Sequence, residues 1–128
     1  MAKYKISVIT LSFDNQEFTE KFVQSIRKNT TLDYELIIVD NGSHTDTQQW
    51  VKKVSDNSII FNSNRGFAKG FNAGLSIAKG EYIAFCDCDD LWSYEKLELQ
   101  LNFMKKTNAN FTFTSYEIIN EQNIKIGE

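Results

Sequence analysis

The order of two kinds of segment constrains the fold of this chain more than any other feature of its sequence. Residues 4–12 (YKISVITLS) and 34–40 (YELIIVD) are rich in isoleucine and valine, which is typical of strands buried on both faces of a sheet. Between them, residues 16–28 repeat phenylalanine or isoleucine at every fourth position, which gives a helix one apolar face. Strands that alternate with helices in this way predict a parallel α/β sheet with right-handed crossovers.

The same alternation continues to the end of the chain. Three further strands are predicted, at 57–61, 81–86 and 109–119. Three further helices are predicted, around Trp50, over 66–79 and over 93–106. The length of 128 residues suits one hydrophobic core. We therefore expect one α/β domain over residues 1–128, with a mostly parallel, Rossmann-like sheet flanked by helices and ending after a fifth strand or its hairpin.

Charge and composition disfavour several classes of protein. The net charge of −3 and the pI near 5.2 give no general attraction to nucleic acid or to anionic lipid, so a phosphate ligand needs a local binding device. No apolar run approaches the ~20 residues of a transmembrane helix, and the first residues form no apolar signal sequence. A disulfide between Cys86 and Cys88, which are spaced C-x-C, is not expected, which fits reduced thiols. We expect a cytoplasmic protein without nucleic-acid partners.

Residues suited to ligand binding collect at the carboxyl ends of four predicted strands. In chain order they are Leu11, Ser12 and Phe13; Asp40, Asn41, Gly42 and Ser43; Asn62, Asn64 and Arg65; and Asp87, Cys88, Asp89 and Asp90. In open parallel sheets, ligands bind beyond the carboxyl ends of the strands. The sequence therefore predicts one binding site built from all four groups.

The fourth group places three carboxylates after a buried strand, where their like charges repel one another. Asp87, Asp89 and Asp90 offer hard oxygen ligands, which select magnesium or manganese over soft metals. Magnesium usually keeps open positions for waters and substrate phosphates. We therefore predict a divalent-metal site here. The alternative is a set of solvated acids that cap the following helix near Ser93.

The second group suits the recognition of a base or a ribose. The Asp40 carboxylate or the Asn41 amide oxygen could accept a hydrogen bond from a pyrimidine N3–H. The alternative is an ordinary strand-to-helix turn rich in Asx residues and glycine. In that case Ser43 or Thr45 could serve only as the N-cap of the next helix.

Glycines recur at every fourth residue of the third predicted helix. Gly66, Gly70 and Gly74 therefore share one helix face, which predicts a close approach to a neighbouring backbone or ligand. Arg65 and Lys69 lie near the start of the same helix. They could contact phosphates there, or they could be solvated surface cations.

These motifs, in this order and spacing, resemble the family 2 glycosyltransferases, which are inverting enzymes with the GT-A fold. SVITLSFDN resembles the family's first strand and aromatic–Asn pair, and ELIIVDNGSHTDT resembles its Asp-Asp-Gly-Ser-x-Asp motif. NRGFAKGFNAGLSIAKGEYIAFCDCDDLW contains two Asn-x-Gly steps, Ala-x-Gly-Glu-Tyr and the D-x-D-D signature. EKLELQ fits the following helix. The resemblance covers nearly the whole chain and implies the GT-A fold.

The resemblance also implies a role for each matching residue. Asp89 matches the aspartate that binds Mn²⁺ or Mg²⁺, and Asp87 helps to hold the metal or the ribose. The nucleotide contacts that it implies are Leu11, Ser12 and Phe13 against the base, Asp40 and Asn41 at the base edge, Cys88 beside Asp87, and Lys69 and Asn72 towards the diphosphate. Phe71 stands where many members have arginine, which leaves Lys69 as the cation for the phosphates.

The implied reaction is the transfer of a sugar from a nucleoside diphosphate to an acceptor hydroxyl by a single in-line displacement, with inversion. Its setting is bacterial polysaccharide or cell-surface glycan synthesis. A UDP-sugar is the favoured donor, with dTDP and GDP as alternatives because Asn41 replaces a frequent second aspartate. The implied acceptor is a glycan or a lipid-linked glycan, which is compatible with a place at the inner face of a membrane.

Family domains usually continue into an acceptor-binding half that carries the general base. This sequence ends at Glu128, so we expect that half to be missing from it, and we assign no catalytic base. Such a chain is either part of a longer enzyme or a non-catalytic nucleotide-sugar-binding fragment. An open edge at the fifth strand would favour self-association.

Two other classes place acids at strand ends. A haloacid-dehalogenase-type phosphatase has its nucleophile in a D-x-D motif, but there Gly and Thr or Val normally follow, in place of Asp90 and Leu91. A response-regulator receiver lacks the D-x-D turn. Both are remote alternatives.

Overall fold

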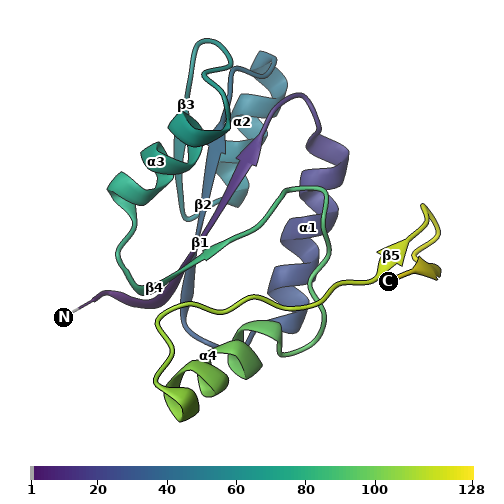
Figure 1. Cartoon of the computed structure of the whole chain (residues 1–128). Helices are drawn as coiled ribbons and strands as arrows, with labels where there is room; N and C mark the ends of the chain where they lie inside the picture. Colours follow the sequence, from purple (N-terminus) through teal and green to yellow (C-terminus); the bar gives the residue numbers. More distant parts are fainter. Residues whose placement is uncertain (1) are drawn as a thin grey trace.

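A computed structural model of the chain describes residues 2–128 (Figure 1). The main sheet has four strands in the order β3-β2-β1-β4, and every neighbouring pair is parallel. The strands are β1 (Tyr4–Ser12), β2 (Tyr34–Asp40), β3 (Asn57–Ile60) and β4 (Gly80–Phe85). This arrangement confirms the predicted α/β class with a Rossmann-like parallel sheet.

A helix follows each of these strands along the chain. The helices are α1 (Gln16–Asn29), α2 (Thr45–Val54), α3 (Phe67–Ile77) and α4 (Lys96–Thr107). Their positions match the amphipathic segments of the sequence. Within residues 2–128, none of them has both the length and the apolar character needed to cross a bilayer.

The carboxyl ends of the two central strands lie level with each other. The pairing of β1 with β2 runs from Ile6 opposite Tyr34 to Ser12 opposite Asp40. On its other side β1 pairs with β4, whose Phe85 lies opposite Ile9. The loop after β4 therefore begins beside the last residues of β1.

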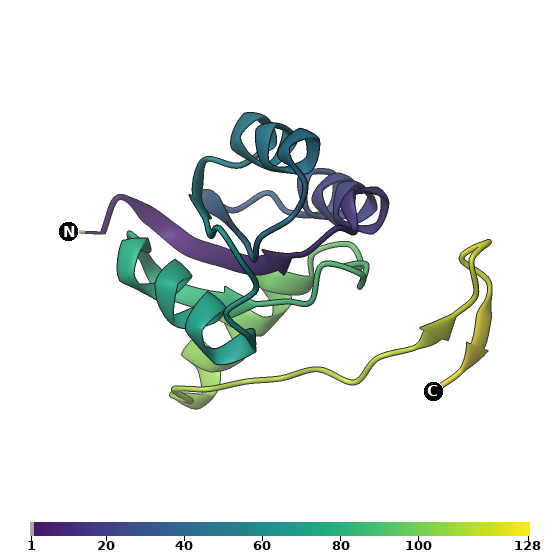
Figure 2. The ribbon, with the colours of Figure 1, turned by 90° about the horizontal axis from the view of Figure 1, so that it is seen from above.

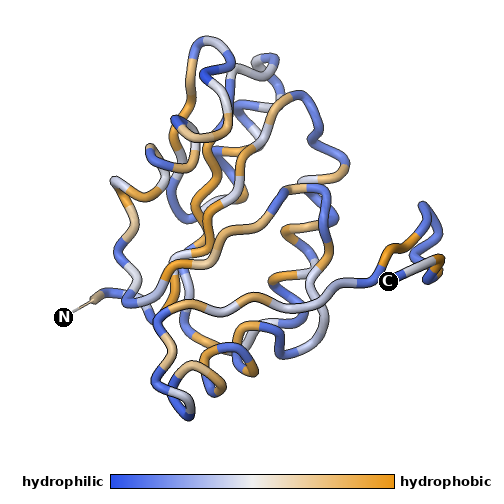
Figure 3. Tube along the Cα trace, in the orientation of Figure 1, coloured by the Kyte–Doolittle hydropathy of each residue, from blue (hydrophilic) through white to orange (hydrophobic). Residues whose placement is uncertain are grey.

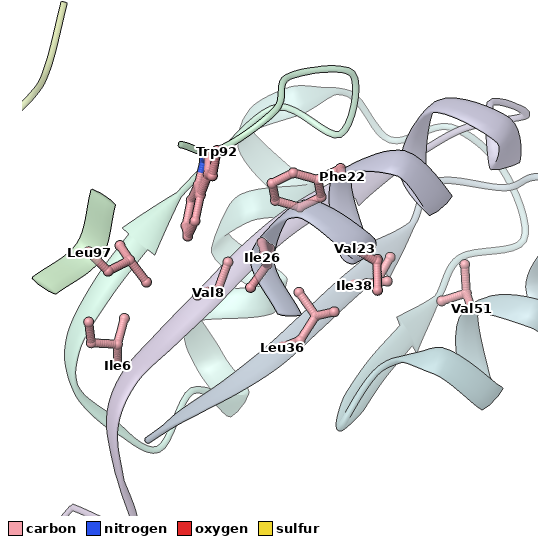
Figure 4. Close-up of a cluster of buried hydrophobic side chains, with 10 residues drawn as sticks. All are labelled: Ile6, Val8, Phe22, Val23, Ile26, Leu36, Ile38, Val51, Trp92 and Leu97. Atoms are coloured by element: carbon pink, nitrogen blue, oxygen red, sulfur yellow. The ribbon is translucent and has the colours of Figure 1, made fainter. Parts of the chain in front are cut away.

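Different helices cover the two faces of the sheet (Figure 2). On the face of α1 and α2, the buried cluster drawn in Figure 4 consists of Ile6, Val8, Phe22, Val23, Ile26, Leu36, Ile38, Val51, Trp92 and Leu97. On the face of α3, the cluster consists of Ile9, Ile37, Val39 and Phe71. Because successive strand residues point to opposite faces, β1 and β2 are apolar along most of their length, as the colours of Figure 3 show.

A buried carboxylate fixes the start of β4 at the amino end of the sheet. Glu35 is only 2% exposed, and its Oε1 atom accepts hydrogen bonds from Ser7 Oγ and from the backbone N–H of Lys79, each at 2.5 Å. Ser7 Oγ in turn accepts from the backbone N–H of Gly80 at 2.8 Å. These bonds hold the turn between α3 and β4 against the central strands.

β4 forms one edge of the main sheet among the described residues, and one of its faces is largely uncovered. Its burial alternates along the strand, with Ile83 39% and Phe85 54% exposed. Both side chains are on the face of α3, because they lie opposite Ser7 and Ile9 in β1. α3 packs over β1 and β2 and reaches this apolar strip at Phe85, whose ring lies edge-to-face with Phe71 at 5.2 Å between centroids, while much of the strip stays exposed.

The predicted strand over 109–119 is wrong as a member of the main sheet. The residues from Asn110 to Glu117 form no strand, and Phe111 and Phe113 are 77% and 82% exposed. Only β5 (Ile118–Ile119) is a strand, and it pairs antiparallel with β6 (Lys125–Gly127) in a separate hairpin that extends away from the sheet (Figures 1 and 2). The predicted turn towards a hairpin is therefore confirmed, whereas the pairing with the main sheet is not.

Candidate functional site

Four loops follow the carboxyl ends of the parallel strands, as the sequence predicts. We call them loop 1 (residues 13–15), loop 2 (41–44), loop 3 (61–66) and loop 4 (86–95). Hydrogen bonds between side chains and backbone connect these loops to one another. The candidate site is the surface that they form together.

Loop 4 brings its acids together at the surface. The backbone N–H of Asp90 donates to the Asp87 carbonyl at 3.2 Å, which closes a turn over DCDD. Asp87, Asp89 and Asp90 are all exposed, and each has a carboxylate oxygen within 4.8 Å of the others. Burial, followed by the charges of Asp89 and Asp87, raises the pKa of Asp90. Three hard oxygen donors within reach of one ion fit Mg²⁺ or Mn²⁺, whose charge would offset this repulsion.

Cys88 points inward from the same turn. It is 8% exposed, and its Sγ atom accepts a hydrogen bond from Asn15 Nδ2 at 2.8 Å. Burial raises the pKa of the Cys88 thiol. The thiol thus attaches loop 4 to loop 1 while the flanking acids Asp87 and Asp89 face solvent.

Cys86 is partly buried and packs against the core. Its Sγ atom accepts from Trp92 Nε1 at 2.7 Å, and burial raises its pKa to about 12. Thr10 Oγ1 donates to the Cys86 carbonyl at 2.8 Å. These bonds fix both ends of the acidic turn, and both cysteines are free thiols, as expected.

Asp40 ends β2 as a fully buried carboxylate. Its Oδ2 atom accepts from the backbone N–H groups of Gly42 at 3.2 Å and Ser43 at 2.8 Å. Its Oδ1 atom is also buried but has no hydrogen-bond partner within residues 2–128. A buried acceptor without a donor is costly, so this oxygen is suited to a donor supplied by a ligand.

Asn41 uses its side chain within the protein. Its Oδ1 atom accepts from Arg65 N at 2.9 Å, and its Nδ2 atom donates to the Gly66 carbonyl at 3.3 Å. Gly42 strengthens the same contact between loops 2 and 3, since a Cβ atom there would lie 2.7 Å from the Ser63 backbone. The structure thus brings Asn41 to the site, where it orders loop 3.

The three predicted residues at the end of β1 differ in exposure. Ser12 is buried and donates to Asn15 Oδ1 at 3.3 Å. Leu11 is partly buried and packs under α3. Phe13 is 48% exposed, so it is the member of this group with apolar surface available to a base.

The glycine repeat of α3 has the predicted packing role at two of its three positions. A Cβ atom at Gly70 would lie 2.8 Å from Leu11 Cδ2, and one at Gly74 would lie 2.5 Å from Ile9 Cγ2. Gly66 faces open space and has a φ of +84°. Lys69 and Asn72 are exposed on the outer surface of α3 and are separate from the contacts that join the loops.

Sequence reasoning missed the residues that connect the loops. Asn15 Oδ1 accepts from Phe13 N and from Thr19 Oγ1 while its amide donates to Cys88. Asp14 binds loop 2 through His44. The aromatic–Asn motif marked this segment. Its partners in the other loops, Ser43 for Asp14 and Cys88 for Asn15, lie 29 or more residues away along the chain.

The sequence and the fold both have counterparts among known proteins. The chain matches Glycosyl transferase family 2 over residues 7–127, so it belongs to that family. It is 35% identical over 127 residues to the UDP-Glc:alpha-D-GlcNAc-diphosphoundecaprenol beta-1,3-glucosyltransferase WfgD of Escherichia coli. That match covers 97% of this chain and 50% of the relative, so the chain spans about half the length of this relative.

Solved structures share the fold. The crystal structure of S. aureus TarS 1-349 in complex with UDP-GlcNAc superposes with a TM-score of 0.73 at 23% identity, covering 91% of this chain and 38% of that one. The mannosyltransferase PcManGT of Pyrobaculum calidifontis, in complex with GDP-Man and Mn2+, has a TM-score of 0.70 at 21% identity, covering 80% and 33%. These likenesses confirm the GT-A architecture.

Proposed function

We propose that the chain is the donor-binding domain of an inverting glycosyltransferase that moves a sugar from a nucleoside diphosphate to an acceptor hydroxyl. The observation that carries this proposal is the convergence of three carboxylates in loop 4, attached through Cys88 to loop 1. Membership of family 2 supports it. The general base and the acceptor site remain unassigned among these residues.

The acids of loop 4 are proposed to hold a divalent cation, Mg²⁺ or Mn²⁺. Asp89 and Asp87 are the proposed ligands, and Asp90 lies within reach of the same ion. When bound, such a cation would neutralise charge on the leaving diphosphate. Lys69 and Asn72 are proposed to approach the diphosphate from α3. A related structure that contains Mn2+ supports the choice of metal.

The base is proposed to bind between loop 1 and loop 2. Asp40 Oδ1 would accept the N3–H of uracil, and Phe13 would pack on the ring, with Leu11 and Ser12 behind it. Asn41 would affect nucleotide binding indirectly, by ordering loop 3. Cys88 would do so by holding the acidic turn against loop 1. UDP is the favoured nucleotide, because the name of the E. coli relative contains UDP-Glc and the TarS structure of similar fold is a complex with UDP-GlcNAc. The alternatives are dTDP and GDP.

The acceptor is proposed to be a glycan or a lipid-linked glycan in polysaccharide synthesis. The diphosphoundecaprenol in the name of the E. coli relative supports a lipid-linked acceptor. Work on such an acceptor would place the protein on the cytoplasmic side, peripheral to the inner face of the membrane.

Self-association is proposed through the open edge of β4 and the exposed side chains of Ile83 and Phe85. A strictly monomeric protein in light scattering at high concentration would contradict the proposed self-association.

Calorimetric titration with UDP, dTDP and GDP, each with and without Mn²⁺, tests the proposed donor site. We expect UDP to bind only with metal, and we expect Asp89→Ala to abolish that binding. The matched control is Asp33→Ala, which removes an exposed aspartate just before β2, at the opposite end of the sheet. Binding that is equal in Asp89→Ala and wild type would contradict the metal site. Binding without sugar transfer would favour the non-catalytic alternative.

A further inference from the structure

Loop 1 and loop 2 are joined by a polar contact that we call the Asp14–His44 pair. Asp14 Oδ1 accepts a hydrogen bond from the backbone N–H of His44 at 2.9 Å, and the ring Nδ1 atom of His44 lies 2.8 Å from the same oxygen. In the opposite direction, the backbone N–H of Asp14 donates to Ser43 Oγ at 2.8 Å. Because backbone and side chain take part on both sides, these contacts fix the separation of the two loops.

Asp14 has a backbone conformation that few non-glycine residues adopt. Its φ of +47° lies in the left-handed region, which aspartate tolerates better than most residues. Such a conformation persists where neighbouring contacts compensate for its cost. The bonds to Ser43 and His44 provide that compensation, so the turn and the pair depend on each other.

The pair lies between the two side chains that are proposed to contact the base. Phe13 directly precedes Asp14 in loop 1. On loop 2, the Ser43 backbone N–H donates to Asp40 Oδ2 at 2.8 Å, while Ser43 Oγ accepts from Asp14. A continuous series of hydrogen bonds therefore runs from Asp40 through Ser43 to Asp14, one residue from Phe13.

We propose that the Asp14–His44 pair positions the nucleotide base by holding Phe13 at the separation from Asp40 that a base requires. This inference rests on the proposed function and adds two residues to it. The His44 side chain is 87% exposed, so its effect passes through Asp14 and not through core packing. Both are positioning residues, because neither is proposed to contact the base itself.

Charge makes the pair sensitive to pH. The hydrogen bond to Asp14, and then the charge of Asp14, raise the pKa of His44, and Asp46 on α2 acts in the same direction. The hydrogen bonds from His44 lower the pKa of Asp14. With a raised folded-state pKa, the ionic contact is complete below the ordinary histidine value of ~6.5 and is lost as pH rises through the raised value. Nucleotide affinity should fall across the same window.

Calorimetric titration of UDP in saturating Mn²⁺, between about pH 6 and pH 8, tests the proposal. At the lower pH we expect His44→Ala and Asp14→Asn each to weaken UDP binding by about two- to fivefold, the range typical of an exposed ion pair. The difference from wild type should shrink as pH rises. His44→Asn keeps a donor near the Nδ1 position, so it should recover most of the affinity and lose the pH dependence.

Two controls separate positioning from folding and from the metal site. Asp33→Asn removes an exposed charge at the opposite end of the sheet and should keep wild-type affinity across the pH range. Binding of Mn²⁺ alone should be the same in every variant, and each variant should keep a cooperative thermal unfolding transition above the temperature of the titration. Equal UDP affinity in wild type and His44→Ala at the lower pH would overturn the positioning role of the Asp14–His44 pair and leave the proposed function standing. Wild-type protein that binds no nucleotide overturns the proposed function, and this inference with it.

Discussion

Loop 2 and loop 4 occupy the same edge of the sheet but are built in opposite ways. Loop 2 and the end of β2 are buried and hydrogen-bonded, with Asp40 and Asn41 0% and 5% exposed. Loop 4 directs Cys88 and Trp92 inward and exposes three acids that repel one another. The comparison teaches that the base side of the proposed site is held by internal hydrogen bonds before any ligand arrives, whereas the metal side gains its favourable electrostatics only when a cation arrives.

The largest effect should come from breaking loop 2 at Gly42. Gly42→Ala forces a side chain into a φ of +93° and places its Cβ atom 2.7 Å from the Ser63 backbone. We expect the free energy of unfolding to fall by about 3 kcal/mol in urea denaturation, because strain and overlap add.

The matched control is Gly66→Ala, which has a φ of +84° but open space around the new Cβ atom. Only the conformational cost of this glycine-specific region (φ +84°, ψ 172°) applies there, so a loss of about 1–3 kcal/mol, smaller than that of Gly42→Ala, is expected. Similar losses at the two positions would show that the close contact between loops 2 and 3 contributes little.

An intermediate effect is expected from Asp40→Asn. The amide oxygen can still accept from the backbone N–H groups of Gly42 and Ser43, but without the charge both bonds weaken, which should lower the free energy of unfolding by about 1–2 kcal/mol. The substitution should also abolish UDP binding. Asp56→Asn is the control, because Asp56 Oδ2 also accepts from a backbone N–H, that of Leu36 at 2.8 Å, on the far side of the sheet from loop 4. Calorimetry with UDP should show loss at Asp40 and wild-type affinity at Asp56.

The smallest effect belongs to loop 4. Because the folded-state pKa of Asp90 is raised, its ionisation opposes folding as pH rises through that value. Asp90→Asn should therefore stabilise the metal-free protein at neutral pH by only about 0.3 kcal/mol, since the side chain is largely solvated. The gain should vanish below the ordinary aspartate pKa, and also when Mn²⁺ is added. Destabilisation of the metal-free protein at neutral pH would contradict the repulsion inferred here.

The sequence predicted most of the scaffold because its signals are local. The apolar, β-branched run over residues 34–40 predicted a strand buried on both faces. The spacing of Gly70 and Gly74 predicted a close contact between helix and sheet. The strand predicted over 109–119 failed for a physical reason. Alternation at Phe111 and Phe113 describes which way side chains point, but a strand also needs a paired backbone. Residues 110–117 pair with no strand within residues 2–128, although the edge of β4 is open.

The site was predicted at the level of its groups but not of its hydrogen bonds. The carboxyl-edge rule located Asp40 and the acids of loop 4 correctly. It could not show that Asn41 uses both ends of its amide on Arg65 and Gly66, because those partners are more than 20 residues distant. Ser43 was placed in the second group and considered as a helix cap. The N-cap of α2 is His44 instead, and the Ser43 hydroxyl accepts from the backbone N–H of Asp14, a bond that was not predicted.

The close packing of α3 on the sheet has a consequence for motion. With Gly70 against Leu11 and Gly74 against Ile9, the helix cannot slide along β1 without steric overlap, so the wall behind the proposed base site is rigid. Loop 2 is held equally firmly at Gly42. Any rearrangement that accompanies donor binding is therefore expected in loop 4, whose surface acids can change their spacing while Cys88 and Trp92 keep the loop attached.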